Sequence, residues 1–289
     1  MTPRDILLAL VPPLCWGVGF AIAKPAVTHF PPLFMMTLVY CAIALTMSLT
    51  ARAPVRTPWL SLFLISLFVV PLQGILIFTG LRGLEAGVAT LVIQIQVPFA
   101  VVLGWLVAGE NLNLRKCAGT LVALAGVALV IGLPQATPPL VPVLLVIAGS
   151  LIWALGQVLA RKLGRDSGLI LYKGVALAGT PQLILATALF ETGQWRAVSD
   201  AGPWDWAALG FVALVGFYLS YVSWFALLRR FRMDDVAPFT LLMPVTGLIA
   251  AALFLGEHIQ PAHLIGGAVL IAGLAIVTGL GPFRQTQSA

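Results

Sequence analysis

Two stretches of the chain repeat one pattern: GENLNLRKCAGTLVALAGVALVIG (109–132) and GEHIQPAHLIGGAVLIAGLAIVTG (256–279). Each opens on Gly-Glu, and glycines follow the glutamate at identical distances. They are Gly119, Gly126 and Gly132 in the first stretch and Gly266, Gly273 and Gly279 in the second. The chain therefore contains an internal duplication.

The duplication extends upstream, where Trp16 and Lys24 match Trp153 and Arg161. The offset there is 137 residues, against 147 near the ends of the two halves. The difference places an insertion of 10 residues in the second half, and we expect it in the polar stretch 191–205. We divide the two copies at 1–135 and 136–289.

The composition indicates a protein that lies in a lipid bilayer. With 60% hydrophobic and 9% charged residues, the chain lacks the polar surface of a soluble protein, in which about a quarter of the residues are charged. We predict ten spans, at about residues 6–27, 31–51, 58–80, 87–109, 117–133, 141–160, 168–190, 205–227, 236–256 and 264–282. These runs are continuously apolar, without the alternation of a membrane strand, so we predict an all-α integral membrane protein.

Each half holds five spans, and an odd number inverts the second copy relative to the first. We therefore predict ten transmembrane helices as two inverted five-helix repeats. Many secondary transporters have this arrangement, and their repeats rock about a site near the membrane midplane to give alternating access.

The net charge of +6 suggests an anionic partner such as nucleic acid, but its distribution indicates topology instead. With both termini in the cytoplasm, 12 of the 16 Lys and Arg residues fall on the cytoplasmic side. Only Lys24, Arg82 and Arg196 fall on the other side, with Lys173 inside the seventh span. We expect a multi-pass protein, no nucleic-acid partner and, because no cleavage pattern follows the first span, no removable signal peptide.

The three cysteines, Cys15, Cys41 and Cys117, lie within or at the edge of predicted spans. Their number is odd, so we expect small buried side chains and no structural disulfide.

Several segments resemble one transporter family. The run Trp16-Gly17-Val18-Gly19-Phe20 with Lys24, and then Pro31-Pro32-Leu33, is similar to the first two helices of EamA-type transporters of the drug/metabolite transporter superfamily. AGVATLVIQIQ (86–96) followed by Gly109-Glu110 resembles their fourth helix. VAP (236–238) through LLMPV (241–245) to Gly256-Glu257 resembles it again in the second half. The resemblance covers the whole chain as two EamA domains.

Within that family, the paired glutamines and the Pro-Pro-Leu element are most similar to bacterial exporters of cysteine and O-acetylserine. The resemblance implies a secondary transporter of the bacterial inner membrane that exports small polar metabolites, amino acids or their derivatives. Its partners are then a small-molecule substrate and the lipid bilayer, and a monomer suffices because the duplication supplies both halves. Broad drug or xenobiotic efflux and metabolite uptake are alternatives on the same fold.

Polar side chains inside a span are costly in lipid, so they are candidates for the substrate site. They are Gln73 in the third span, Gln94 and Gln96 in the fourth, and Gln157 in the sixth. An amide can donate to a carboxylate and accept from an ammonium group, which suits an amino acid. Gln94 and Gln96 lie about 200° apart on a helix, so at most one of them faces the cavity directly. Interhelical hydrogen bonds are the alternative role.

Aromatic and basic side chains complete the predicted site. Trp16 and Trp153 occupy equivalent places in the repeats, and Tyr218, Tyr221 and Trp224 recur in the eighth span. These rings either line a cavity and hold an ammonium group, or only pack helices together. Lys24, toward the outer end of its span, either attracts a carboxylate or extends to the headgroups. The same alternatives apply to Lys173 beside Tyr172.

Three further patterns concern the helices themselves. Pro98 and Pro244 interrupt corresponding helices, so we predict hinges there, with static kinks as the alternative. The repeated glycines are seven residues apart on one face, which favours close helix packing. Glu110 and Glu257 are expected to accept N–H groups of a helix start or loop, or to pair with cations.

Other chemistry has no support in the sequence. The three histidines form no metal signature, and the spans hold no catalytic set or phosphate-binding loop, so we expect no metal, no cofactor and no enzyme activity. Residues 6–27 contain no carboxylate, which favours export driven by the substrate gradient over proton antiport.

Overall fold

The computed structural model describes residues 2–109, 113–132, 138–231 and 236–278 and is helical throughout these ranges, apart from the connections. The first repeat contains α1 (Pro3–His29), α2 (Pro32–Thr50), α3 (Trp59–Leu67), η1 (Phe68–Leu72), α4 (Gln73–Gly83), α5 (Ala86–Val92), η2 (Ile93–Ile95), α6 (Gln96–Ala108) and α7 (Leu114–Gly132). The second contains α8 (Leu140–Leu163), α9 (Gly168–Phe190), α10 (Gln194–Asp200), α11 (Pro203–Phe211), η3 (Val212–Leu219), α12 (Ser220–Leu228), η4 (Ala237–Leu241), α14 (Leu242–Leu255) and α15 (Pro261–Thr278).

Ten spans follow from these elements, as predicted. Within the described residues, 9 helical segments are long and apolar enough to cross a membrane, and Phe239–Leu255 is a shorter apolar tenth. The short helix α10 falls within 191–205, where the insertion was expected. The equivalent connection of the first repeat, between α2 and α3, contains no such helix. The proposed boundary between the copies, at 135/136, lies outside the described residues.

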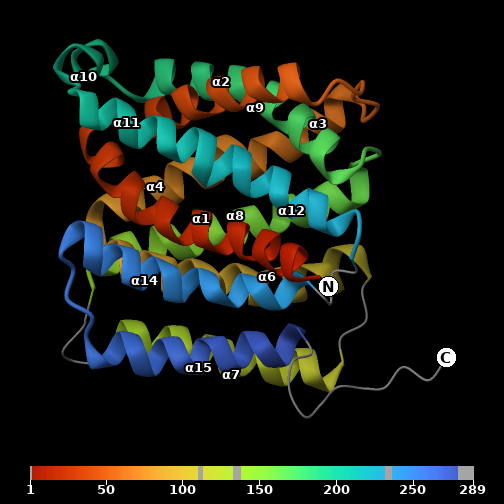
Figure 1. Cartoon of the computed structure of the whole chain (residues 1–289), viewed down its shortest axis with the longest axis vertical. Helices are drawn as coiled ribbons and strands as arrows, with labels where there is room; N and C mark the ends of the chain where they lie inside the picture. The colour runs from red at the N-terminus through yellow and green to blue at the C-terminus, as the bar shows by residue number, and fades with distance from the viewer. Residues whose placement is uncertain (1, 110–112, 133–137, 232–235, 279–289) are drawn as a thin grey trace.

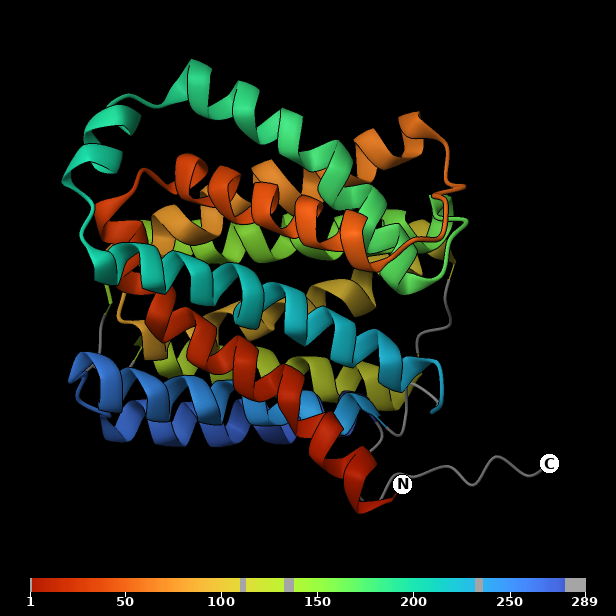
Figure 2. The same ribbon diagram turned by 45° about the horizontal axis from the view of Figure 1, so that its top comes forward.

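The two repeats are interlocked. Helix α1 of the first repeat packs mainly against α14, α12 and η3 of the second, and Figures 1 and 2 both show it between α12 and α14. Its counterpart α8 packs mainly against α4 and α6 of the first repeat. The first helix of each repeat therefore packs against helices of the other repeat, and both repeats contribute to the centre of the bundle.

The repeats also share their irregularities. The third span of the first half contains a π-helical segment, η1, and the equivalent span of the second half contains η3. The 3₁₀ segments η2 and η4 lie in the next pair of spans, three residues before Pro98 and Pro244 respectively. Proline removes an N–H from the helical ladder, and such segments often mark hinges. The hinge role of both prolines stays a prediction.

The repeated Gly-Glu motif ends a helix in each half. Gly109 and Gly256 adopt left-handed backbone conformations, with φ of 68° and 67°, at the C-terminal ends of α6 and α14. Glycine adopts this conformation without the steric cost that a Cβ imposes.

Helices α7 and α15 pack through the repeated glycines, side by side at the bottom of Figure 1. An added Cβ on Gly126 would lie 2.8 Å from the carbonyl oxygen of Gly266, and one on Gly119 would lie 2.8 Å from that of Gly273. Gly266 is the counterpart of Gly119, and Gly273 that of Gly126, so the contact looks the same from either helix, as at a two-fold axis. The predicted close packing is confirmed.

The cysteine prediction was wrong for two of the three side chains. Cys41 and Cys117 are exposed on the outside of the bundle, and Cys15 is half-buried. The outer surface also carries large apolar side chains such as Phe190 and Leu253, both 76% exposed. A membrane protein faces lipid, so a small apolar residue gains little from burial inside the bundle.

Substituting Gly126 tests the α7–α15 contact. In Gly126→Ala the new methyl group would lie 2.3 Å from the backbone nitrogen of Leu270, which cannot swing away as a side chain does. We expect a loss of about 1–3 kcal/mol in stability, seen as a lower unfolding temperature in detergent. Gly210→Ala is the control, because a Cβ there meets nothing within 4 Å. Equal unfolding temperatures for the two variants would contradict this packing.

Candidate functional site

An aromatic cluster lies at the junction of the repeats. Trp16, the middle residue of α1, has its ring centroid 5.6 Å from that of Tyr221 and 5.8 Å from that of Trp224, both on α12. Tyr221 in turn stacks on Tyr172 of α9 at 4.2 Å. Three of the predicted aromatic residues, Trp16, Tyr221 and Trp224, are thus brought together from both repeats.

Tyr218 is not part of this cluster, because it makes no ring contact in the described part of the chain. Phe217 takes that place, with its ring 6.4 Å from Tyr221 and 6.0 Å from Tyr40 of α2. Residues 218, 221 and 224 were expected to form the face, whereas 217, 221 and 225 follow the i, i+4, i+8 spacing of a helix face, and the ring of Phe225 lies 6.0 Å from that of Tyr221. That spacing could have identified Phe217 and Phe225.

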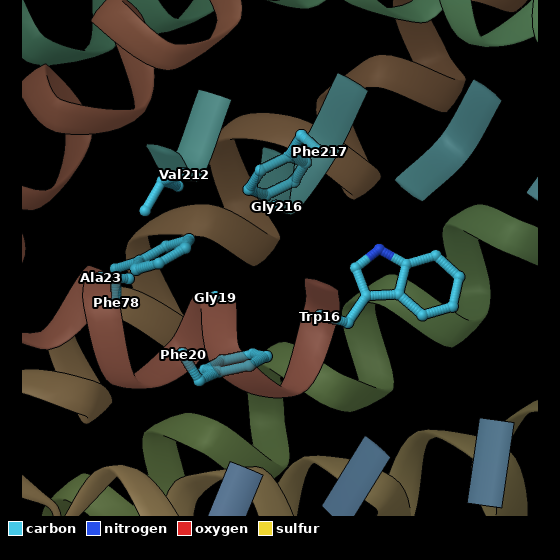
Figure 3. A pocket seen from close by; sticks show the side chains of 8 residues that line it. All are labelled: Trp16, Gly19, Phe20, Ala23, Phe78, Val212, Gly216 and Phe217. Carbon is cyan, nitrogen blue, oxygen red and sulfur yellow. The ribbon is translucent and has the colours of Figure 1, made fainter. Parts of the chain in front are cut away.

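A cavity of about 60 Å³ lies beside the cluster, between α1 and η3. It is lined by Trp16, Gly19, Phe20, Ala23, Phe78, Val212, Gly216 and Phe217. Figure 3 shows Phe78 and Phe217 beside Gly19 and Gly216, with the rings of Phe20 and Trp16 farther along α1. Gly19 and Gly216 lie near the middle of their spans, so the cavity lies near the membrane midplane and is lined by both repeats.

The predicted glutamines lie on the elements that surround α8. Gln73 begins α4, Gln94 is in η2, Gln96 begins α6, and Gln157 is on α8 itself. Gln94 is only 3% exposed, and its Oε1 has no hydrogen-bond partner in the described structure. The other three amides are half-buried. No hydrogen bond joins these four side chains to one another within the described residues.

Trp153 differs from its counterpart Trp16. It is half-buried on α8 and makes no ring contact among the described residues. Its role in substrate binding stays a prediction, as do the roles of the glutamines.

The half-buried Lys24 and the buried Lys173 both donate to main-chain carbonyls. The ammonium group of Lys24 donates to the carbonyl of Leu84 in the α4–α5 turn, and the carboxylates of Glu85 and Glu257 act on it electrostatically. Lys173 donates to the carbonyls of Ala51 and Ala53, at 2.7 Å each, after the end of α2. Each lysine therefore ties its helix to a connection, and attraction of a substrate carboxylate by Lys24 stays a prediction.

Carboxylates serve as partners for backbone N–H groups. Glu257 accepts from the amides of Ala86 and Gly87 at the start of α5, at 2.6 and 2.9 Å, as expected. Glu191 accepts from Leu33 and Phe34 at the start of α2, at 2.8 Å each. The first amides of a helix have no partner within it, so a carboxylate from elsewhere satisfies them. The expectation for Glu110 concerns a residue outside the described ranges.

Asp166, between α8 and α9, holds the α2–α3 connection in the same way. Its carboxylate accepts from the amides of Arg56 and Thr57 and from the Thr57 hydroxyl, the last at 2.6 Å. Partial burial on its own would raise the pKa of Asp166. The hydrogen bond from the Thr57 side chain and those from the two amides outweigh this effect and hold the pKa below its ordinary value.

The lowered pKa of Asp166 predicts an acid-dependent contribution to stability. The contribution is complete above the pKa of the unfolded chain, about 3.9, and is lost as the pH falls through the lower folded-state pKa. Asp166→Asn should therefore lower the unfolding temperature at pH near 6, and its difference from wild type should shrink below about pH 4. A difference that does not depend on pH would contradict this account.

Fold and site together define a class of protein. Inverted repeats that exchange their first helices, around a mid-membrane cavity lined by both, have the architecture of a secondary membrane transporter.

Comparisons with known proteins agree with this class and supply the family. The chain belongs to the EamA-like transporter family, whose model matches residues 4–132 and 140–279. A curated relative from Salmonella typhimurium, named a probable amino-acid metabolite efflux pump, is 30% identical over 96% of this chain and 95% of its own length. A protein of the same name from Escherichia coli is 28% identical over 96% of this chain and 95% of its own length.

The fold has a solved counterpart. A crystal structure that matches 100% of both chains superposes with a TM-score of 0.70 at 20% identity. The names of the family and the relatives indicate a transporter and not an enzyme.

Proposed function

We propose that this transporter exports small amino-acid metabolites across the bacterial inner membrane by alternating access. The observation that carries the proposal is the cavity at mid-span, lined by α1 of one repeat and η3 of the other. In transporters built from inverted repeats, the substrate site lies near the midplane where the repeats meet, and rocking of the repeats exposes it to each side in turn.

The side chains around the cavity suit an amino acid. Trp16 borders both the cavity and the ring of Tyr221, so an ammonium group there would meet aromatic faces. Outside the cavity lining, the buried hydroxyl of Tyr172 in the aromatic cluster and the Oε1 of Gln94 in η2 have no hydrogen-bond partner in the described structure. A buried polar atom without a partner is costly in a membrane, and a bound polar substrate or water would remove that cost.

The substrate class draws on the relatives as well as on the cavity. The two relatives above are named as amino-acid metabolite efflux pumps, and cysteine and O-acetylserine are the metabolites that the sequence resemblance suggests. A cavity of about 60 Å³ favours small metabolites over drug-sized molecules, whose pockets typically measure about 300–1,000 Å³. Broad drug efflux is therefore the weaker alternative. Metabolite uptake on the same fold is the other alternative, and it concerns the direction of transport.

The acidic side chains favour transport without proton exchange. Among the described residues, carboxylates lie in connections or near helix ends, and Glu257, Glu191 and Asp166 already accept backbone N–H groups. No carboxylate of the described structure lies near the middle of a span, where a proton carrier would be needed. We propose that the substrate's own gradient drives export by a monomer with both termini in the cytoplasm.

Uptake into proteoliposomes tests this proposal. Labelled cysteine, O-acetylserine and an aromatic amino acid are each supplied with and without an imposed pH gradient. We expect saturable uptake of at least one of the first two, unchanged by the gradient. Stimulation by the gradient would contradict the uncoupled mechanism, and no uptake of any amino acid would remove the substrate assignment.

Trp16→Ala tests the site itself. A cation–π contact shielded from water is worth about 2 kcal/mol, so kcat/KM for the transported amino acid should fall roughly tenfold or more. Trp195→Ala is the matched control, because this tryptophan of α10 is 87% exposed and should leave transport unchanged. Equal transport by the two variants would place the substrate elsewhere.

A further inference from the structure

Two glycines line the cavity where α1 and η3 approach each other. Gly19 belongs to the first repeat and Gly216 to the second. An added Cβ on Gly19 would have the Cα of Gly216 as its nearest neighbour, at 3.7 Å, and one on Gly216 would meet nothing closer than 3.9 Å. These are ordinary van der Waals distances, so helix packing does not require glycine at either position.

Another glycine of α1 has a different role. Gly17, two residues before Gly19, would bring a Cβ 2.0 Å from the Oγ1 of Thr246 and 2.8 Å from the backbone nitrogen of Gly247. Glycine is required there because two backbones touch. At Gly19 and Gly216 an added methyl group would only reach van der Waals contact, and because both residues line the cavity, either methyl group would narrow it.

The cavity accepts an apolar group of limited size. Its walls include the rings of Phe20, Phe78 and Phe217 and no charged side chain (Figure 3). An apolar cavity that binds benzene measures about 150 Å³. The smaller volume of this cavity therefore favours an aliphatic side chain over an aromatic ring.

We propose that this cavity is the side-chain pocket of the substrate site and that Gly19 and Gly216 set its size limit. The favoured substrates are then amino acids with an aliphatic rather than an aromatic side chain. The ammonium group of such a substrate lies against Trp16, which borders both the pocket and the aromatic cluster. The inference rests on the proposed amino-acid transport and narrows its substrates.

The test is the selectivity of purified protein in proteoliposomes. Labelled alanine, leucine and phenylalanine are compared by kcat/KM in wild type, Gly19→Ala and Gly216→Ala. One methyl group in an apolar pocket changes kcat/KM by roughly tenfold or more, so the leucine-to-alanine ratio should fall by about that factor in both variants. Gly210→Ala, six residues earlier in the same span as Gly216, should keep the wild-type ratio.

A variant that enlarges the pocket should change selectivity in the opposite direction. Phe20→Ala removes one wall, and phenylalanine transport should rise relative to leucine transport. Unchanged ratios in both glycine variants, or equal losses for all three substrates, would overturn the size limit while leaving amino-acid transport in place. If the wild-type protein transports none of the panel and none of the polar metabolites above, the proposed function itself fails.

Discussion

The contact between the backbones of α1 and α14 is the constraint on which the rest of the structure depends. Gly17 allows the approach, and the hydroxyl of Thr246 donates to the carbonyl of Pro13 at 3.0 Å. Helices in a membrane gain little from the hydrophobic effect when they associate, so small residues and close contacts must hold them together. This contact anchors α1 in the opposite repeat, and α8 is anchored in the first repeat through Gly149 and Gly156. The central cavity is bounded by both repeats as a result.

The site departs from the symmetry of the scaffold. The glycines of α7 and α15 match across the repeats, and the π and 3₁₀ segments recur in equivalent spans. By contrast, Trp16 joins a chain of aromatic rings, whereas Trp153 makes no ring contact among the described residues. If the proposed function holds, symmetric packing provides the two similar arrangements that alternating access needs, and the asymmetric side chains place the proposed substrate contacts on the α1 side.

The sequence predicted the scaffold well because duplication and hydropathy depend on many residues at once. The ten spans, the position of the insertion at α10 and the glycine packing of α7 on α15 all follow from such patterns. The site was predicted less completely. Phe217 replaced Tyr218 in the cluster, and Lys173 bonds to carbonyls of the α2–α3 connection. These features depend on which helices meet and at what rotation, and one sequence does not reveal long-range contacts.

The most direct test of the central claim is substrate protection of a single cysteine in the cavity. Ala23 lines the cavity and is 2% exposed, so Ala23→Cys, with Cys15, Cys41 and Cys117 replaced by serine, reports on that space alone. The account predicts that a thiol reagent labels this cysteine during transport and that a transported amino acid slows labelling in the concentration range of its KM. Labelling that saturating substrate leaves unchanged, in a variant that still transports it, would contradict the account.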